Sequence, residues 1–262
     1  MWLCHSHHPA MTLDERLWKT FNKALGQYQL IDEGDHILVG LSGGKDSLLL
    51  TEFLARRSKV HVPHFTVSAL HVRMENIHYE TDTTYLQSFC SQLGVPLHLI
   101  TTRFESAPNL SSVPYTETSS RSSSKPKPPC FLCSWQRRKQ LFNLAQELGC
   151  TKIALGHHQD DIIHTALMNL TFQGHFSTMP AKLRMRKMPL TIIRPLCLCR
   201  EDDIRAYAEA NHYEKQPKLC PYEHDTNRTT IARIFDTMQQ LSPEARNSIW
   251  KALEADNKLV EY

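Results

Sequence analysis

The chain has 262 residues, of which 41% are hydrophobic and 22% charged, and a formal net charge of +3. These values are ordinary for a globular protein, and such a small net charge does not by itself indicate a nucleic-acid-binding protein. No stretch approaches the roughly 18 apolar residues of a membrane span and no secretory signal is evident, so we expect a cytoplasmic protein with reduced thiols and no membrane partner.

Apolar patterning predicts strands that alternate with helices, after a flexible tail at 1–11. Five apolar runs are expected to form strands: 37–39, 65–72, 96–100, 152–155 and 191–194. Helices are expected at 14–28, 48–56, 81–93, 134–148 and 201–211, after 156–161, and beyond 227. This order predicts one α/β domain at 12–240, with a parallel five-stranded sheet and helices on both faces, followed by a helical tail at 241–262.

The first predicted strand runs directly into a glycine-containing turn, SGGKDS at 42–47, and a helix follows. In this context two glycines let the backbone approach a phosphate, and the helix amides supply a positive field. The turn is not a Walker A loop, which would need glycine at Val39 and Ser or Thr at Asp46. The predicted nucleotide-binding residues are Ser42, Gly43, Gly44, Lys45, Asp46 and Ser47.

Two further segments are expected to complete the nucleotide site. Ala69 and His71 end the second predicted strand, where an adenine base would lie, although His71 is alternatively a plain strand-end residue. The sequence GHHQDD at 156–161 follows the fourth predicted strand, and its Gly156 and His157 are expected beside the nucleotide.

The two acidic residues of this second loop have two interpretations. Asp160 or Asp161 is expected to hold Mg²⁺ together with Asp46, because Mg²⁺ prefers carboxylates and phosphate oxygens. The other is expected to cap the next helix, where carboxylates are favoured. We assign catalytic roles to all three aspartates.

A polar segment at 104–129 is rich in Ser, Thr and Pro, and its length and polarity predict a mobile loop. It is either a lid that closes over the site when RNA binds or an insertion without a role.

Cys130 and Cys133 follow this segment with the spacing of metal ligands. Cys220, in a polar loop beside a proline, is the best candidate for a third ligand. The spacing alone allows zinc, a redox dithiol or an iron–sulfur cluster. The remaining internal cysteines lie among apolar residues, where free cysteine is commonly a small buried hydrophobe: Cys90, Cys150, Cys197 and Cys199.

Basic residues are concentrated in two runs, 121–139 and 175–200, which each contain six Lys or Arg and no acid. Charge runs are often just solvated faces, but these flank the thiols and are expected to contact RNA phosphates.

Four residues near the cysteine pair have individual predictions. Phe131 and Trp135 are candidates to stack on an extruded base, with core packing the alternative for Trp135. Arg137 and Arg138 are expected to stabilise charge on the phosphate or on the activated base.

SGGKDS resembles the PP-loop of the ATP pyrophosphatase family, whose members cut ATP between the α and β phosphates and transfer AMP to a carbonyl oxygen. A nucleophile then displaces the adenylate. Five features taken together indicate a more specific family. Over about 14–238 the chain resembles the tRNA 2-thiocytidine synthetase family. The five features are SGGKDS at 42–47, CFLC at 130–133, GHHQDD at 156–161, IRPL at 193–196 and the lone Cys220.

The resemblance implies that Cys130, Cys133 and Cys220 hold a [4Fe-4S] cluster. It also implies that ATP activates C2 of an anticodon-loop cytidine in tRNA, where sulfur replaces oxygen. We further expect Mg²⁺ as a cofactor, a sulfur donor such as a cysteine desulfurase, and a homodimer. Two alternatives remain. One is a PP-loop enzyme that acts on another tRNA base or uses an amine nucleophile, such as a lysidine synthetase, and the other is a non-catalytic zinc-bearing RNA-binding protein.

Overall fold

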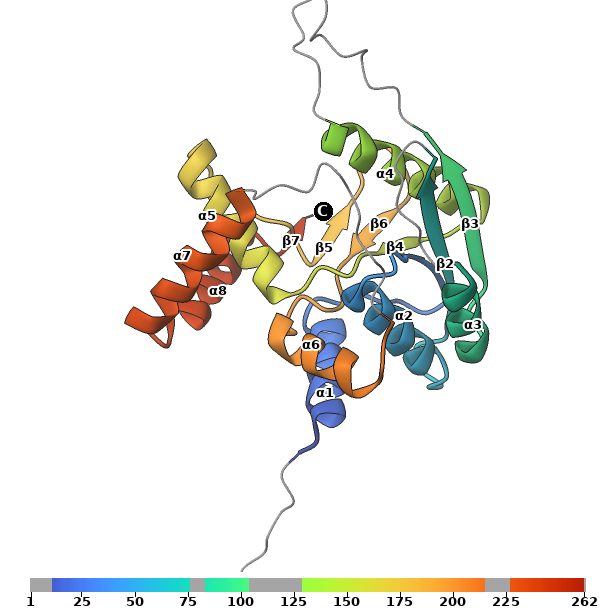
Figure 1. The fold of residues 1–262 in the computed structure, drawn as a ribbon, viewed down its shortest axis with the longest axis horizontal. Coiled ribbons are helices and arrows are strands. Elements are labelled where there is room, and N and C mark those ends of the chain that lie inside the picture. The colour runs from blue at the N-terminus through green and yellow to red at the C-terminus, as the bar shows by residue number, and fades with distance from the viewer. Residues whose placement is uncertain (1–10, 76–82, 104–128, 215–226, 262) are drawn as a thin grey trace, which may run out of the picture.

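The protein is seen here as a computed structural model that describes residues 11–75, 83–103, 129–214 and 227–261. Its strands form one sheet, with helices packed on both faces (Figure 1). Cys220 and nearly all of the predicted loop at 104–129 lie outside the described residues. Among the described helices, none has the length and apolarity that crossing a bilayer requires.

The five expected strands all lie in the sheet. They are β1 (Asp35–Gly40), β2 (Phe65–Met74), β3 (Leu97–Thr102), β4 (Lys152–Ala154) and β6 (Thr191–Ile193). They are parallel and stand in the order β3-β2-β1-β4-β6. The chain therefore moves outward from β1 to β3 and then returns to the other side of β1. The point of return lies between the carboxyl ends of β1 and β4, where open α/β sheets bind ligands.

Within the described residues the sheet has seven strands rather than five. β5 (Lys182–Arg184) pairs antiparallel with β6, and β7 (Val260–Glu261) pairs with β5 at the edge. Both were missed because they are only three and two residues long and contain charged side chains, so neither has the apolar run that identifies a buried strand.

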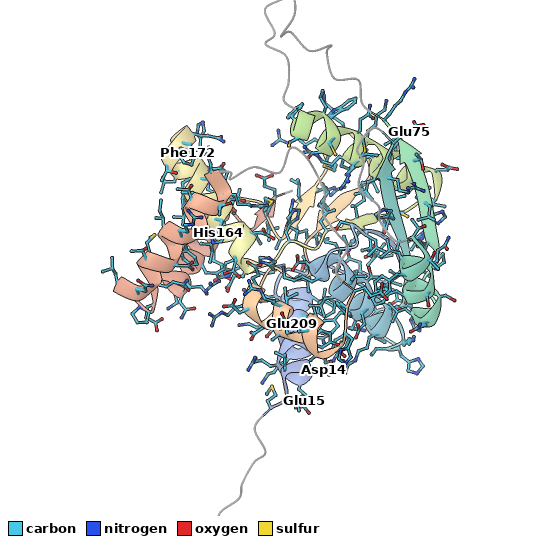
Figure 2. All side chains as sticks on the ribbon, viewed as in Figure 1. Asp14, Glu15, Glu75, His164, Phe172 and Glu209 are labelled. Atoms are coloured by element: carbon cyan, nitrogen blue, oxygen red, sulfur yellow. The ribbon has the colours of Figure 1, made fainter. Side chains whose placement is uncertain are left out.

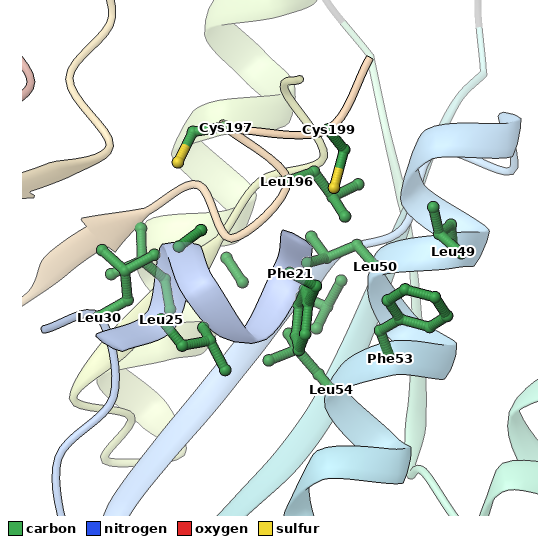
Figure 3. Packing of buried hydrophobic residues seen from close by; sticks show 14 of the residues in the cluster. Phe21, Leu25, Leu30, Leu49, Leu50, Phe53, Leu54, Leu196, Cys197 and Cys199 are labelled. Atoms are coloured by element: carbon green, nitrogen blue, oxygen red, sulfur yellow. The ribbon is translucent and has the colours of Figure 1, made fainter. Parts of the chain in front are cut away.

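Two core clusters separate the helices into layers. Ile37 and Val39 belong to one cluster and Leu38 to the other, because successive strand residues face opposite sides of a sheet. The larger cluster includes side chains from the helices drawn below the sheet in Figure 1. They are α1 (Leu13–Gln27), α2 (Lys45–Ser58), α3 (Thr83–Leu93) and α6 (Glu201–Ala210). Figure 3 shows Phe21, Phe53 and the two cysteines Cys197 and Cys199 within it.

Helix α4 (Pro129–Glu147) covers the opposite face and begins five residues earlier than the 134–148 expected. Proline is well tolerated at the first position of a helix, where its missing N–H group is not needed. The helix consequently includes both cysteines of the 130–133 motif.

The C-terminal region packs against α5 (Gln159–Gln173), which follows β4. Helices α7 (Asn227–Leu241) and α8 (Ala245–Ala255) lie beside α5 (Figure 1). The segment 241–262, expected as a helical tail, ends in strand β7, and Trp250 and Leu253 of α8 belong to the larger core cluster. This segment is therefore part of the folded core.

Candidate active site

The phosphate loop joins β1 to α2 and is shaped by hydrogen bonds between its own residues. Gly43 has a φ of +84°, a left-handed conformation that favours glycine. The Ser42 hydroxyl accepts the Gly44 amide at 3.3 Å and lies 3.1 Å from the Ser47 hydroxyl. The Ser47 hydroxyl donates to the Gly44 carbonyl at 2.9 Å. Helix α2 then begins without a side-chain cap, which leaves its positive end to an anion.

Gly156, in the loop after β4, packs directly on the phosphate loop. A Cβ atom at Gly156 would lie 3.0–3.1 Å from backbone atoms of Asp46 and Ser47, closer than nine in ten real Cβ contacts. Glycine therefore lets the two loops approach without displacing this backbone, and the contact places the acidic residues of both loops near each other.

His158 lies between two of the predicted metal-binding carboxylates. Its Nε2 atom is 3.9 Å from Asp46 Oδ1 and 3.5 Å from Asp161 Oδ2. Asp46 Oδ1 is shielded from solvent and has no hydrogen-bond partner among the described residues, although Lys45 Nζ lies 3.2 Å away. Asp161 caps α5 by accepting the His158 amide and also pairs with Arg228 at 3.2 Å.

This arrangement fits Mg²⁺ only with help from the nucleotide. Within the described residues, no group of three or more His, Cys, Asp or Glu side chains could hold a metal ion by itself. Mg²⁺ is commonly held by one or two carboxylates and completed by phosphate oxygens and water. Asp46, with its unbonded buried oxygen, and Asp161 can supply the protein's share.

Asp160 is engaged by two other helices. Its Oδ2 atom accepts the Glu201 amide at 2.8 Å, and its Oδ1 atom pairs with Arg246 of α8 at 2.6 Å. Burial would raise the pKa of the Asp160 carboxyl, but these hydrogen bonds outweigh burial and lower it. Arg246 was not identified from the sequence, because nothing local marks a partner 86 residues away.

His157 contacts the buried residue Arg194, which belongs to the IRPL motif after β6. The Arg194 Nε–H group donates to His157 Nδ1 at 3.3 Å, and Nη1–H donates to the Pro180 carbonyl. Burial and the neighbouring guanidinium lower the pKa of His157 to about 4, so its imidazole is neutral at physiological pH. Because Nδ1 accepts, the neutral ring carries its proton on Nε2.

Ala69 and His71 are buried in β2. The His71 Nδ1–H group donates to the Leu41 carbonyl at 2.8 Å, one residue before the loop begins. Burial, assisted by the positive charge of Arg137, lowers the pKa of His71. The structure thus gives His71 a role in supporting the loop and places Arg137 on the side of α4 that faces the sheet, whereas Arg138 is exposed.

A cavity of about 770 Å³ opens beside the phosphate loop. It is lined by the loop, by α6 and by three residues shortly after α6, His212, Tyr213 and Glu214, and Glu209, one of the lining residues, is marked in Figure 2. Lys45 Nζ contacts Asp46 and Glu201 at this cavity, both at 3.2 Å. Glu201 was not singled out by the sequence, although it follows the last predicted parallel strand and so lies near the ligand-binding edge.

The thiol pair lies at the start of α4, with Cys130 in its first turn and Cys133 at the beginning of the second. Gln140, in the middle of this helix, hydrogen-bonds Thr102 at the carboxyl end of β3 at 3.5 Å. Cys133 lies seven residues before Gln140, or roughly 10 Å further along a helix that rises 1.5 Å per residue. Because α4 ends near the start of β4, its first turn projects beyond the same sheet edge as the phosphate loop.

The pair is compatible with ligation of a cluster. Cys130 is exposed and Cys133 half-buried, and residues three apart face the same side of a helix. The first turn of a helix also favours anionic groups. Cys220, the predicted third ligand, lies outside the described residues.

The other internal cysteines are core residues. Burial raises the pKa of Cys90 and Cys150 to about 11 and that of Cys199 to about 12. Cys197 has no exposed surface. Thiols so buried remain protonated, which agrees with their interpretation as small hydrophobes.

The phosphate loop at the switch point of a parallel sheet defines the chain as a PP-loop protein, and the family model of the PP-loop domain matches residues 12–123. More narrowly, the chain belongs to the tRNA-cytidine(32) 2-sulfurtransferase family. A member from Pseudomonas syringae pv. tomato is 32% identical over 258 residues, which cover 95% of this chain and 89% of that protein. The member from Bordetella avium is 35% identical over 242 residues, covering 92% and 73%.

The fold is similar to that of a solved thiolase. The U34-tRNA thiolase NcsA from Methanococcus maripaludis, determined with its [4Fe-4S] cluster, superposes with a TM-score of 0.72 at 24% identity. The match covers 93% of this chain and 79% of NcsA. This likeness confirms the predicted α/β PP-loop fold.

Proposed function

We propose that the protein is an ATP-dependent tRNA sulfurtransferase that adenylates the C2 oxygen of cytidine 32 and replaces this oxygen with sulfur. The supporting observation is that two groups of reactive residues lie at the same edge of the sheet. A phosphate loop with a carboxylate partner and a helix that presents two thiols both lie at the carboxyl edge of one sheet. Family membership supplies the substrate class.

The chain's own residues hold the nucleotide for the first step. The amides of the phosphate loop and Lys45 bind the β and γ phosphates, which leave as pyrophosphate. Asp46 and Asp161 hold Mg²⁺ against the phosphates, and Gly156 keeps these two carboxylates close. His157, a neutral donor through Nε2–H, is suited to an oxygen on which negative charge develops.

Cys130, Cys133 and Cys220 are the proposed ligands of a [4Fe-4S] cluster. When bound through three thiolates, such a cluster has one iron without a protein ligand, and this position supplies the sulfur chemistry. An amine-transferring enzyme would have no use for three such cysteines.

The exposed face of α4 supports an RNA substrate. Phe131 and Trp135 are 43% and 48% exposed, so Trp135 is not a core residue. Arg138 and Lys139 continue the same face one turn later, and Lys139 Nζ lies 5.5 Å from the centre of the Trp135 ring. Exposed aromatic and basic side chains along one helix suit unpaired bases and their phosphates.

The second basic run is less suited to this role. Arg184, Arg186 and Lys187 are exposed around the turn between β5 and β6. Because β5 is antiparallel to β6, this turn lies at the amino edge of the sheet, away from the phosphate loop. We therefore assign the tRNA contact nearest the reaction to α4.

Two partners complete the proposal. Sulfur must come from a donor, for which a cysteine desulfurase has the appropriate chemistry, and we expect the enzyme to be a homodimer. Light scattering of the purified protein tests the second expectation, which fails if the mass is that of one 30.2 kDa chain.

Anaerobic purification followed by product analysis tests the proposed function. The protein should contain iron and acid-labile sulfide, and with tRNA it should convert ATP to AMP and pyrophosphate. A colourless protein with one zinc ion, or ADP and phosphate as stoichiometric products, would reject the proposal.

A further inference from the structure

One carboxylate oxygen stands between two cations beside the phosphate loop. Glu201 Oε1 lies 3.2 Å from Lys45 Nζ and 3.3 Å from Arg205 Nη2. Lys45 belongs to the phosphate loop, whereas Glu201 and Arg205 are one turn apart on α6. All three line the cavity of about 770 Å³, together with Gly43 and Gly44.

The position of Glu201 is fixed by the fold rather than by the ion pairs alone. Its amide donates to buried Asp160 at 2.8 Å, and Asp160 is in turn paired with Arg246. Burial would raise the pKa of the Glu201 carboxyl, but Lys45 outweighs burial and lowers it. An anionic oxygen is therefore held between two cations at the mouth of a phosphate-binding loop.

We propose that Arg205 is a second phosphate-binding residue of this site and that Glu201 occupies, in the nucleotide-free protein, the position of a phosphate oxygen. The ligand class is the polyphosphate end of a nucleotide, or the pyrophosphate that leaves it. This proposal rests on the proposed function only in assuming that the PP-loop binds ATP.

The chemistry of the three side chains explains the exchange. A phosphate group offers several anionic oxygens to Lys45 and Arg205, whereas Glu201 offers one oxygen to both. Arginine is suited to phosphate because its planar group presents parallel N–H donors. The Arg205 side chain is 53% exposed, so it can turn from Glu201 to an incoming phosphate without unpacking a core. Glu201 therefore competes with the phosphate, and its release accompanies binding.

Calorimetric titration of the purified chain with pyrophosphate and with ATP, without tRNA, tests this proposal. Arg205→Gln should weaken both ligands by about tenfold, as expected for the loss of a charge-assisted hydrogen bond. Arg205→Lys should be intermediate, and Glu201→Gln should strengthen binding about threefold or more.

Arg16→Gln is the matched control, because Arg16 is also 53% exposed and also pairs with an α6 carboxylate, Asp203 at 2.7 Å, but does not line the cavity. This variant should bind both ligands as the unsubstituted chain does. Thermal melts of each variant establish that it is folded.

Three results would overturn the proposal. If folded Arg205→Gln binds pyrophosphate within twofold of the unsubstituted chain, Arg205 is not a phosphate ligand. If Glu201→Gln weakens binding in Mg²⁺ but not in its absence, Glu201 is a metal ligand and not a competitor. If the unsubstituted chain binds neither ligand, this proposal and the proposed function both fail. If it binds them but the Arg205 variant does so equally well, only this proposal fails.

Discussion

The phosphate loop and the thiol pair lie at the same edge of the sheet but are held there in different ways. The loop is braced by the fold: its serines bond each other, Gly156 packs on its backbone, and His158 beside it is 5% exposed. The thiols stand at the start of α4, where Cys130 is exposed and its neighbour Phe131 is 43% exposed. The phosphate loop, or nucleotide end of the site, is thus shaped by the fold itself. The thiol pair, or thiol end, needs a bound group to complete its site.

The largest effect should come from removing the thiols. Cys130→Ala, Cys133→Ala or Cys220→Ala should each abolish iron binding and thiolation, because three thiolates are the minimum set for the cluster. Iron and sulfide analysis measures this, with Cys90→Ala and Cys150→Ala as controls that retain both. Full iron content in Cys220→Ala would show that the third ligand is another residue.

At the nucleotide end, Asp46→Asn should lower kcat about a hundredfold, the usual scale for losing one electrostatic group at a reacting centre. ATP affinity should change only a few-fold, because Asp46 positions the metal rather than the nucleotide. Single-turnover AMP formation and equilibrium ATP binding separate these quantities. Equal losses in both would place Asp46 in binding instead.

The exposed face of α4 should affect RNA and not ATP. Trp135→Ala should weaken tRNA binding about tenfold, within the range of roughly 1–3 kcal/mol for one base stacked on an aromatic ring. Phe172→Ala is the control, since this ring is 57% exposed near the outer end of α5 (Figure 2). Equal tRNA affinity of the two variants would remove the α4 surface from the proposal.

Close packing between the phosphate loop and the loop after β4 should contribute to the free energy of unfolding. Gly156→Ala should lower the free energy of unfolding by about 1–3 kcal/mol, the usual cost of inserting a methyl group into a packed site. Gly26→Ala, in α1, has nothing within 4 Å of the added Cβ atom and should stabilise by up to about 1 kcal/mol. Denaturant unfolding of both variants measures this difference. An unchanged free energy of unfolding in Gly156→Ala would contradict the close packing of the two loops.

The last prediction concerns pH. Because burial and Arg194 lower the pKa of His157 from 6.5 to about 4, the folded state favours the neutral ring. The resulting stability is fully present above pH 6.5 and is lost as the pH falls toward 4. Unfolding free energy should therefore decrease across this window, and less steeply in His157→Gln. An unchanged slope in the variant would contradict the assigned environment of His157.

The sequence predicted the nucleotide end better than its surroundings, for a physical reason. The central strands β1 and β4 are buried, and even the partly exposed edge strand β3 begins with apolar residues at alternate positions. The glycine turn at 42–47 follows closely after β1. β5 and β7 carry no such pattern. Arg246 and Arg228 approach the acidic loop from helices far along the chain, and long-range ion pairs leave no local signal.

For the thiol pair, the sequence predicted a ligand role but not the helix on which the two cysteines lie. The spacing of Cys130 and Cys133 predicts that they are ligands, whereas the polar run before Pro129 concealed the start of α4. The exposure of Trp135 could not be decided from the sequence, because helical periodicity placed it near the apolar side.

Nucleoside analysis of tRNA tests the central claim most directly. Bulk tRNA from a strain that lacks this protein should contain no 2-thiocytidine. The unsubstituted gene should restore it, and Asp46→Asn or Cys133→Ala should not, so that both ends of the site are shown to be required. An unchanged level of 2-thiocytidine in the strain that lacks the protein would contradict the account.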